Sequence, residues 1–139
     1  MSRTVRADVV RLVLNQVSDA QLVYLRERGG QKRTFPIVIG IMEAYAMHRA
    51  LRKEKPIRPM THELLYRILD GLNIKVKKVV VSDLRDNTFY AVLSLEMDGK
   101  TIDIDARPSD ALTIAVHYGA PVYVAEHVLR AAEAEPEED

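Results

Sequence analysis

The order of strand-like and helix-like segments repeats about 67 residues along the chain, and this repetition restricts the folds that the chain can adopt. In each copy, three strand-like segments separated by turns precede a helix-like segment. A shift of 67 positions places a few identical residues on one another: Val13 on Val80, Asp19 on Asp86, Thr34 on Thr101, Ile37 on Ile104 and Ala44 on Ala111. Runs of strands followed by helices favour an α+β fold over a parallel, doubly wound sheet.

We therefore predict an α+β fold that contains two duplicated strand–strand–strand–helix units, at about 5–72 and 73–132. The sheets are expected to be mixed or mainly antiparallel and to pack against the helices around one core. The Gly29-Gly30 and Asp98-Gly99 pairs favour tight turns, which makes the second and third strands of each unit antiparallel neighbours.

Apolar spacing and capping residues predict the helices. Helix-like spacing covers 42–52, and Thr61 is expected to cap a second helix over 63–72. The apolar positions of this second helix form one stripe, at 64, 65, 68, 69 and 72. In the second unit we expect a helix over 109–117, a short strand over 122–124 and a final helix over 126–134.

Length and composition limit the class of protein. The 139 residues, 47% of them hydrophobic, suit a single domain over 1–132, and the acidic composition of 133–139 predicts a disordered tail. No apolar run is long enough to cross a membrane, so we expect a soluble, cytoplasmic protein without membrane partners. The absence of cysteine excludes disulfides and thiolate chemistry.

Charge is distributed unevenly along a chain whose net charge is zero. Residues 1–60 contain 12 Lys and Arg against 5 Asp and Glu, whereas residues 61–139 contain 8 against 15. A basic cluster closes the first part and is a candidate contact for a nucleic-acid backbone: Arg49, Arg52, Lys53, Lys55 and Arg58. A solvated helix face is the alternative interpretation of the same charges.

Residues 105–110, Asp-Ala-Arg-Pro-Ser-Asp, are the first candidate site because they place two carboxylates and a guanidinium at a strand-to-helix junction. Asp105 and Asp110 are candidate ligands for Mg²⁺ or Mn²⁺, and Arg107 suits a phosphate. No organic cofactor is expected. A purely structural interpretation has Ser109 as the N-cap, Asp110 as a first-turn acid and Asp105 paired with Arg107.

The second candidate site is Thr61-His62-Glu63. Histidine is the side chain best suited to general acid–base catalysis, and this role is expected for His62, with Glu63 or Glu43 orienting it. In the structural alternative, Thr61 is the N-cap, Glu63 is a favourable first-turn charge, and His62 is partly buried.

Several blocks of the chain closely resemble the bifunctional nuclease domain family. They are Pro36–Gly40, Glu43-Ala44, Arg58–Leu65, Phe89–Ala91 and Asp105–Ala111, in the order and spacing of that family. The resemblance runs from about Val9 to Leu129. It implies an α+β fold with a duplicated core and the ability to degrade RNA and DNA.

The residues and the resemblance together lead to a nuclease hypothesis, in which Asp105, Arg107, Asp110, His62 and Glu63 form the catalytic set and RNA or DNA is the partner. Two alternatives stay open. One is a non-catalytic module that binds an anion or nucleic acid or has a regulatory role. The other is a structural homo-oligomer that covers exposed strand edges.

Overall fold

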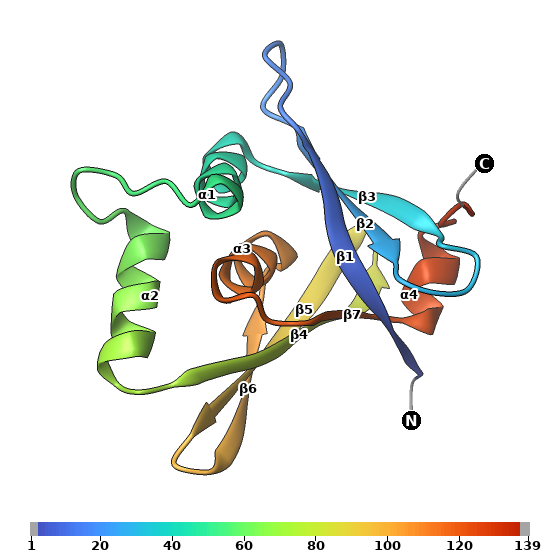
Figure 1. The fold of residues 1–139 in the computed structure, drawn as a ribbon. Helices are drawn as coiled ribbons and strands as arrows, with labels where there is room; N and C mark the ends of the chain where they lie inside the picture. Colours follow the sequence, from blue (N-terminus) through green and yellow to red (C-terminus); the bar gives the residue numbers. More distant parts are fainter. Residues whose placement is uncertain (1–2, 137–139) are drawn as a thin grey trace.

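The computed structural model describes residues 3–136, which form seven strands and four helices (Figure 1). The first part contains β1 (Thr4–Val13), β2 (Gln21–Glu27), β3 (Thr34–Ile39), α1 (Ile41–Arg52) and α2 (Thr61–Gly71). The second part contains β4 (Lys75–Arg85), β5 (Thr88–Met97), β6 (Lys100–Ala106), α3 (Pro108–Tyr118), β7 (Val122–Ala125) and α4 (Glu126–Ala131).

The strands form one mixed sheet in the order β3-β2-β1-β7-β4-β5-β6. All neighbours are antiparallel except β4 and β7, which are parallel. The α+β prediction is therefore confirmed, and so is the antiparallel pairing of the second and third strand in each part. The short strand predicted over 122–124 is β7, which joins the two three-strand groups by pairing with β1 and β4.

Two-residue turns close both hairpins of the second group. Asp86 and Asn87 connect β4 to β5 with φ of 49° and 61°, and Asp98 and Gly99 connect β5 to β6 with φ of 51° and 76°. Positive φ at both central residues is typical of the type I′ turn, whose twist matches that of paired strands. Asp, Asn and Gly adopt this backbone most readily, so these turns set the register of both hairpins.

Helix α3 lies between the sheet and the helices α1 and α2, whereas α4 packs directly against β4 and β7 (Figure 1). Leu112 and Ala115 are buried, Pro108 starts the helix, and Gly119 ends it with φ of 66°. Helix α1 packs against α3 through buried Ala44 and Met47. The apolar faces of α1, α3 and α4, two side chains of α2 and the inner face of the sheet form the core.

The stripe predicted for α2 is only partly buried. Leu69 is buried and Leu65 half-buried, but Leu64, Ile68 and Leu72 are 53%, 45% and 60% exposed. The helix instead buries His62 and Tyr66, because α2 lies at the edge of the molecule and contacts α3 along a neighbouring face (Figure 1). The apolar pattern of α2 therefore does not indicate which side faces the core.

The two parts of the chain share the order strand–strand–strand–helix, but descent by duplication stays a prediction.

The tail predicted to be disordered extends beyond the described residues at 137–139. Within the described part, Glu135 exchanges backbone hydrogen bonds with Thr34 at the free edge of β3. None of the described helices combines the length and apolarity needed to cross a membrane.

We predict that Leu112→Ala destabilises the fold far more than Leu51→Ala. Leu112 is fully buried in α3, so its truncation leaves a cavity and should lower the free energy of unfolding by about 2–5 kcal/mol. Leu51 is 43% exposed, so its truncation should change that free energy by less than about 1 kcal/mol. Urea denaturation of both variants measures the difference, and equal losses would contradict this assignment of the core.

Candidate active site

Strand β6 passes into α3 at a junction where Arg107 is the last residue before the helix. The strand ends at Ala106, Arg107 is extended with φ of −68° and ψ of 142°, and Pro108 is the first helical residue. Proline suits that position because its φ is fixed and a first-turn N–H has no helical partner. The predicted cap at Ser109 is therefore wrong, since this buried residue lies inside the first turn. Asp110 is in that turn, as predicted.

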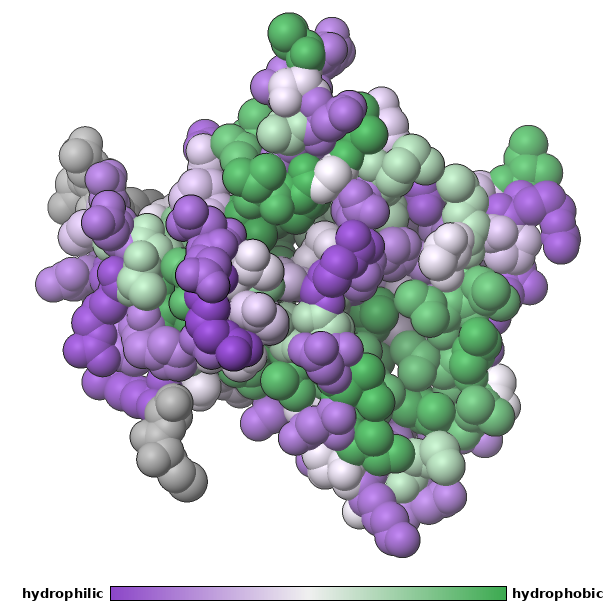
Figure 2. Space-filling model, turned by 180° about the vertical axis from the view of Figure 1, so that it is seen from behind, coloured by the Kyte–Doolittle hydropathy of each residue, from purple (hydrophilic) through white to green (hydrophobic). Residues whose placement is uncertain are grey.

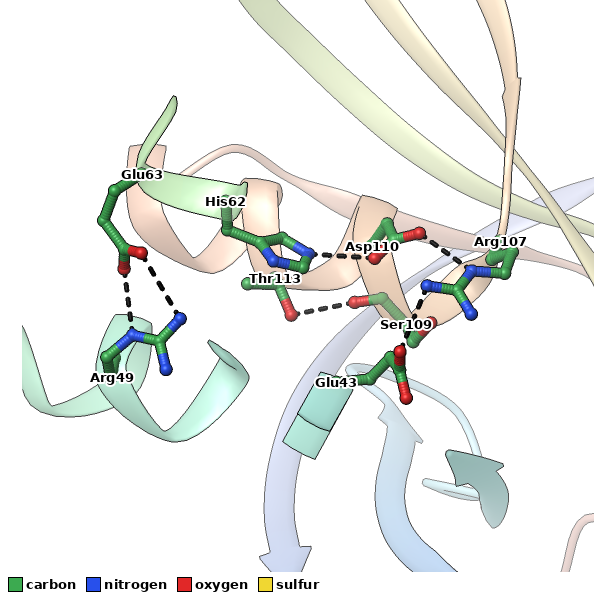
Figure 3. Close-up of polar contacts among 8 residues, drawn as sticks. All are labelled: Glu43, Arg49, His62, Glu63, Arg107, Ser109, Asp110 and Thr113. Carbon is green, nitrogen blue, oxygen red and sulfur yellow. Dashed lines mark hydrogen bonds and ion pairs between the residues drawn. The ribbon is translucent and has the colours of Figure 1, made fainter. Parts of the chain in front are cut away.

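Both carboxylate oxygens of Asp110 are engaged (Figure 3). Oδ1 lies 2.8 Å from His62 Nε2, and Arg107 Nε donates to Oδ2 at 2.9 Å. The hydrogen bond with His62, supported by that from Arg107, outweighs the effect of burial and lowers the pKa of Asp110 to about 2. An ionised carboxylate only accepts hydrogen bonds, so His62 Nε2 carries the proton of this contact at neutral pH.

Asp110 is the one side chain within residues 3–136 that hydrogen-bonds His62. The His62 side chain is only 11% exposed, and its Nδ1 has no hydrogen-bond partner among the described residues. The orienting role that the sequence suggested for Glu63 or Glu43 therefore belongs to Asp110. With Nε2 protonated against the carboxylate, Nδ1 is the nitrogen available to accept a proton.

Arg107 is the most exposed member of this group. Its side chain is 63% exposed, and besides Asp110 it contacts Glu43, with 3.4 Å between Nη2 and Oε2 (Figure 3). Arginine presents several N–H donors in one plane, which matches the oxygens of a phosphate. The guanidinium is thus anchored on one side and open to solvent on the other.

Glu43 reaches Arg107 because Gly40 leaves room for its side chain. A Cβ atom at Gly40 would lie 2.1 Å from Glu43 Oε1, so any larger residue would displace the carboxylate. Sequence reasoning missed this contact, since Glu43 and Arg107 are 64 positions apart. The spacing of Gly40 and Glu43 at the start of a helix is the one local signal for it.

A second ion pair joins α1 to α2. Arg49 donates to both carboxylate oxygens of Glu63, at 3.0 and 3.3 Å, with both side chains mostly buried (Figure 3). Burial raises the pKa of Glu63, but hydrogen bonds from Arg49 and the backbone outweigh it and leave that pKa below its usual value. Glu63 also accepts the Met60 N–H at 3.3 Å. Met60, not Thr61, is the N-cap of α2, so that predicted cap is wrong by one residue.

A hollow of about 220 Å³ opens where α1, α2 and α3 come together. Its ionisable lining consists of Glu43, Arg49, His62, Arg107 and Asp110, and Met42, Met60 and Leu65 add apolar surface. The carboxylates of this region, with Glu63 included, outnumber the guanidiniums by one while His62 is neutral. Net charge therefore does not draw a polyanion into the hollow, and an anion would bind through the exposed face of Arg107.

Asp105 does not join this group. It is exposed on β6, pairs through its backbone with Val92, and makes no side-chain hydrogen bond or ion pair within the described part of the chain. The predicted pairing of Asp105 with Arg107 is therefore wrong. Among residues 3–136, no three His, Asp or Glu side chains gather closely enough to hold a metal ion. A Mg²⁺ or Mn²⁺ site at Asp105 and Asp110 stays a prediction.

The predicted basic cluster is divided by the fold. Arg49 is engaged with Glu63 inside the hollow. The other four residues, Arg52, Lys53, Lys55 and Arg58, are exposed at the end of α1 and on the segment that leads to α2. Nucleic-acid contact by these four residues stays a prediction.

The depressed pKa of Asp110 predicts how stability changes in acid. Above the ordinary pKa of 3.8 this carboxylate is ionised in the folded and unfolded chain, so its contacts stabilise fully. As the pH falls from there toward about 2, the unfolded chain takes up a proton before the folded chain does, and this stabilisation is lost. We expect the difference in free energy of unfolding between the parent and Asp110→Asn to be largest above pH 4 and to shrink toward pH 2.

Urea denaturation at several pH values measures that difference. A difference that stays constant over the whole range would show that the carboxylate is not stabilised by His62 and Arg107 in the folded state.

The chain is similar to proteins of one family. The chain is 38% identical over 124 residues to an uncharacterized protein of Mycobacterium tuberculosis, covering 89% of this chain and 73% of that protein. Bifunctional nuclease 2 of Oryza sativa is 29% identical over 105 residues, and bifunctional nuclease 1 of Arabidopsis thaliana is 26% identical over 105 residues. These matches cover 73% of this chain but 32% of each plant protein. The bifunctional nuclease domain model matches residues 23–137, and the chain belongs to the bifunctional nuclease domain family.

Proposed function

We propose that this chain hydrolyses phosphodiester bonds in RNA or DNA at the hollow between α1, α2 and α3. The observation that carries the proposal is the joint presentation of His62 and Arg107 by one carboxylate, that of Asp110. A proton-transfer group and a phosphate-binding group are thereby held side by side. The plant relatives that are named nucleases support the same chemistry.

Each residue of the network has a distinct role in this proposal. The exposed guanidinium of Arg107 binds the non-bridging oxygens of the phosphate and stabilises the negative charge that develops on them. His62 transfers the proton of the attacking or leaving oxygen through Nδ1. Asp110 is a positioning residue, because it fixes the His62 tautomer and anchors Arg107. No step passes through a metal ion, and dependence on Mg²⁺ or Mn²⁺ stays a prediction that chelation tests.

The exposed basic residues extend the proposed contact with the substrate. Arg52, Lys53, Lys55 and Arg58 are exposed at the end of α1 and on the segment that leads to α2, whose Met60 and Thr61 line the hollow. A nucleic-acid backbone that enters the hollow would pass these side chains, each of which adds a salt-sensitive contact.

A non-catalytic binding module is the second candidate. It is favoured by the engagement of both Asp110 oxygens in hydrogen bonds within the protein. Such a module would bind nucleic acid even after metal ions are removed by a chelator, and it would leave the strand uncut. Its affinity would fall steeply as the salt concentration rises.

A homo-oligomer is compatible with either function. Apolar side chains gather over α2 on the face shown in Figure 2, and the exposed members of this stripe are Leu64, Ile68 and Leu72. Association of two copies would cover such a stripe.

We predict that His62→Gln lowers the kcat/KM for cleavage of a short RNA or DNA at least about 100-fold, because general acid–base catalysis contributes about that much or more. Asp110→Asn should reduce cleavage as well, by releasing His62 and Arg107. His127→Gln is the matched control, since His127 is exposed on α4 and its one side-chain hydrogen bond in the described part of the chain is with Asp83, at 3.3 Å.

The cleavage rates of these variants test the proposed roles, with the folding of each variant confirmed by circular dichroism. Equal rates for His62→Gln and His127→Gln would contradict the proposed role of His62. Asp105→Asn, tested beside them, shows whether Asp105 contributes, because the exposed Asp105 carboxylate contacts none of the proposed residues.

A further inference from the structure

A second hollow, of about 370 Å³, lies on the other side of the contact between Arg107 and Glu43. Both of these residues line both hollows. The remaining walls are residues 36–40 at the end of β3, residues 87–89 at the start of β5, and residues 108–109 of α3. The volume lies within the range of about 300–1,000 Å³ that is common for small-molecule sites.

The wall formed by β3 is an unpaired strand edge. Thr34 directs its backbone N–H and C=O away from β2, because it exchanges hydrogen bonds of 2.7 and 3.2 Å with Glu135. Backbone groups alternate between the two edges of a strand, and β3 pairs regularly with β2, so Pro36 and Val38 point to the same free edge as Thr34. Among the described residues, the Val38 N–H and C=O and the Pro36 C=O have no backbone partner.

This free edge is too short to accept another strand. Glu135 covers it at Thr34, Pro36 has no N–H, and the chain enters α1 directly after Gly40. What remains is one acceptor, Pro36 C=O, beside one donor, Val38 N–H, with the Val38 C=O following. A neighbouring donor and acceptor on one edge are what the Watson–Crick face of a nucleobase presents, and single-stranded bases are recognised through that face.

The other walls suit a planar base attached to a phosphate. Phe89 is half-buried and stacks on Phe35 with 5.6 Å between ring centroids, which gives the hollow a rigid apolar side. Arg107 stands at the boundary with the proposed catalytic hollow. A nucleotide whose phosphate contacts Arg107 can therefore place its base against the edge of β3.

We infer that the 370 Å³ hollow is a nucleobase subsite, in which the backbone of Pro36 and Val38 hydrogen-bonds the base next to the phosphate held by Arg107. This inference rests on the proposed function, because it assigns to Arg107 the phosphate of the same nucleic-acid substrate. The contacts come from the backbone, and every base carries a neighbouring donor and acceptor. The subsite therefore separates a nucleotide from an abasic sugar phosphate more strongly than it separates one base from another.

Val38→Pro is the direct test. Proline removes the Val38 N–H, which β2 does not use, and it suits an edge strand that already holds Pro36 at the equivalent position. The Val38 side chain is 64% exposed, so the core is not altered. Val38→Ala is the matched control, because it changes the side chain and keeps the N–H.

The measurement is the affinity for the four nucleoside 5′-monophosphates relative to ribose 5-phosphate, determined by calorimetry. We expect the parent and Val38→Ala to prefer the nucleotides, and Val38→Pro to lose about three- to tenfold of that preference while its affinity for ribose 5-phosphate stays unchanged. Equal affinities for nucleotide and ribose 5-phosphate in the parent, or an unchanged preference in Val38→Pro, would overturn the inference.

Nuclear magnetic resonance of the parent decides the question if Val38→Pro does not fold. The Val38 amide signal should shift with nucleotides and not with ribose 5-phosphate. A shift caused only by an extended peptide would identify the edge as a peptide site and overturn the inference. A preference for nucleotides over ribose 5-phosphate in a chain that cuts no nucleic acid would refute the nuclease proposal and leave the subsite in place. The two failures are therefore distinguishable.

Discussion

The Asp110 carboxylate connects the parts of the chain that form the candidate active site. It belongs to α3, it accepts hydrogen bonds from His62 of α2 and from Arg107 at the end of β6, and Arg107 in turn contacts Glu43 of α1. A partly buried carboxylate is stable as an anion only when such partners replace water. The same interactions therefore stabilise the charge and fix the relative positions of three helices.

The arrangement divides the surface around Arg107 into two hollows with different chemistry. On one side lie the ionisable groups suited to proton transfer, and on the other lie an aromatic ring and the free backbone of β3. A nucleotide has the same division, with a charged phosphate and a planar base. This correspondence links the proposed catalysis to the proposed base recognition and makes Arg107 the point where they meet.

Local sequence signals predicted most of the fold and little of the site. Turn residues such as Asp98-Gly99 indicated the hairpins because their backbone conformation is determined locally. The buried face of α2 was not predictable, because Leu64 and Leu65 are equally apolar and only the position of α3 selects between them. Asp110 and Arg107 were identified as neighbours in sequence. His62, the partner of Asp110, lies 48 positions away in the sequence, and the spacing of apolar residues does not predict a contact between residues so far apart in the chain.

The most direct test is a crystal structure of the chain soaked with a short oligonucleotide and Mn²⁺. Our account predicts a phosphate on the exposed face of Arg107, with His62 Nδ1 toward the scissile bond and the adjacent base against Val38. The manganese density would show separately whether Asp105 and Asp110 hold a metal. An oligonucleotide bound elsewhere, with Arg107 still closed between Asp110 and Glu43, would contradict the account.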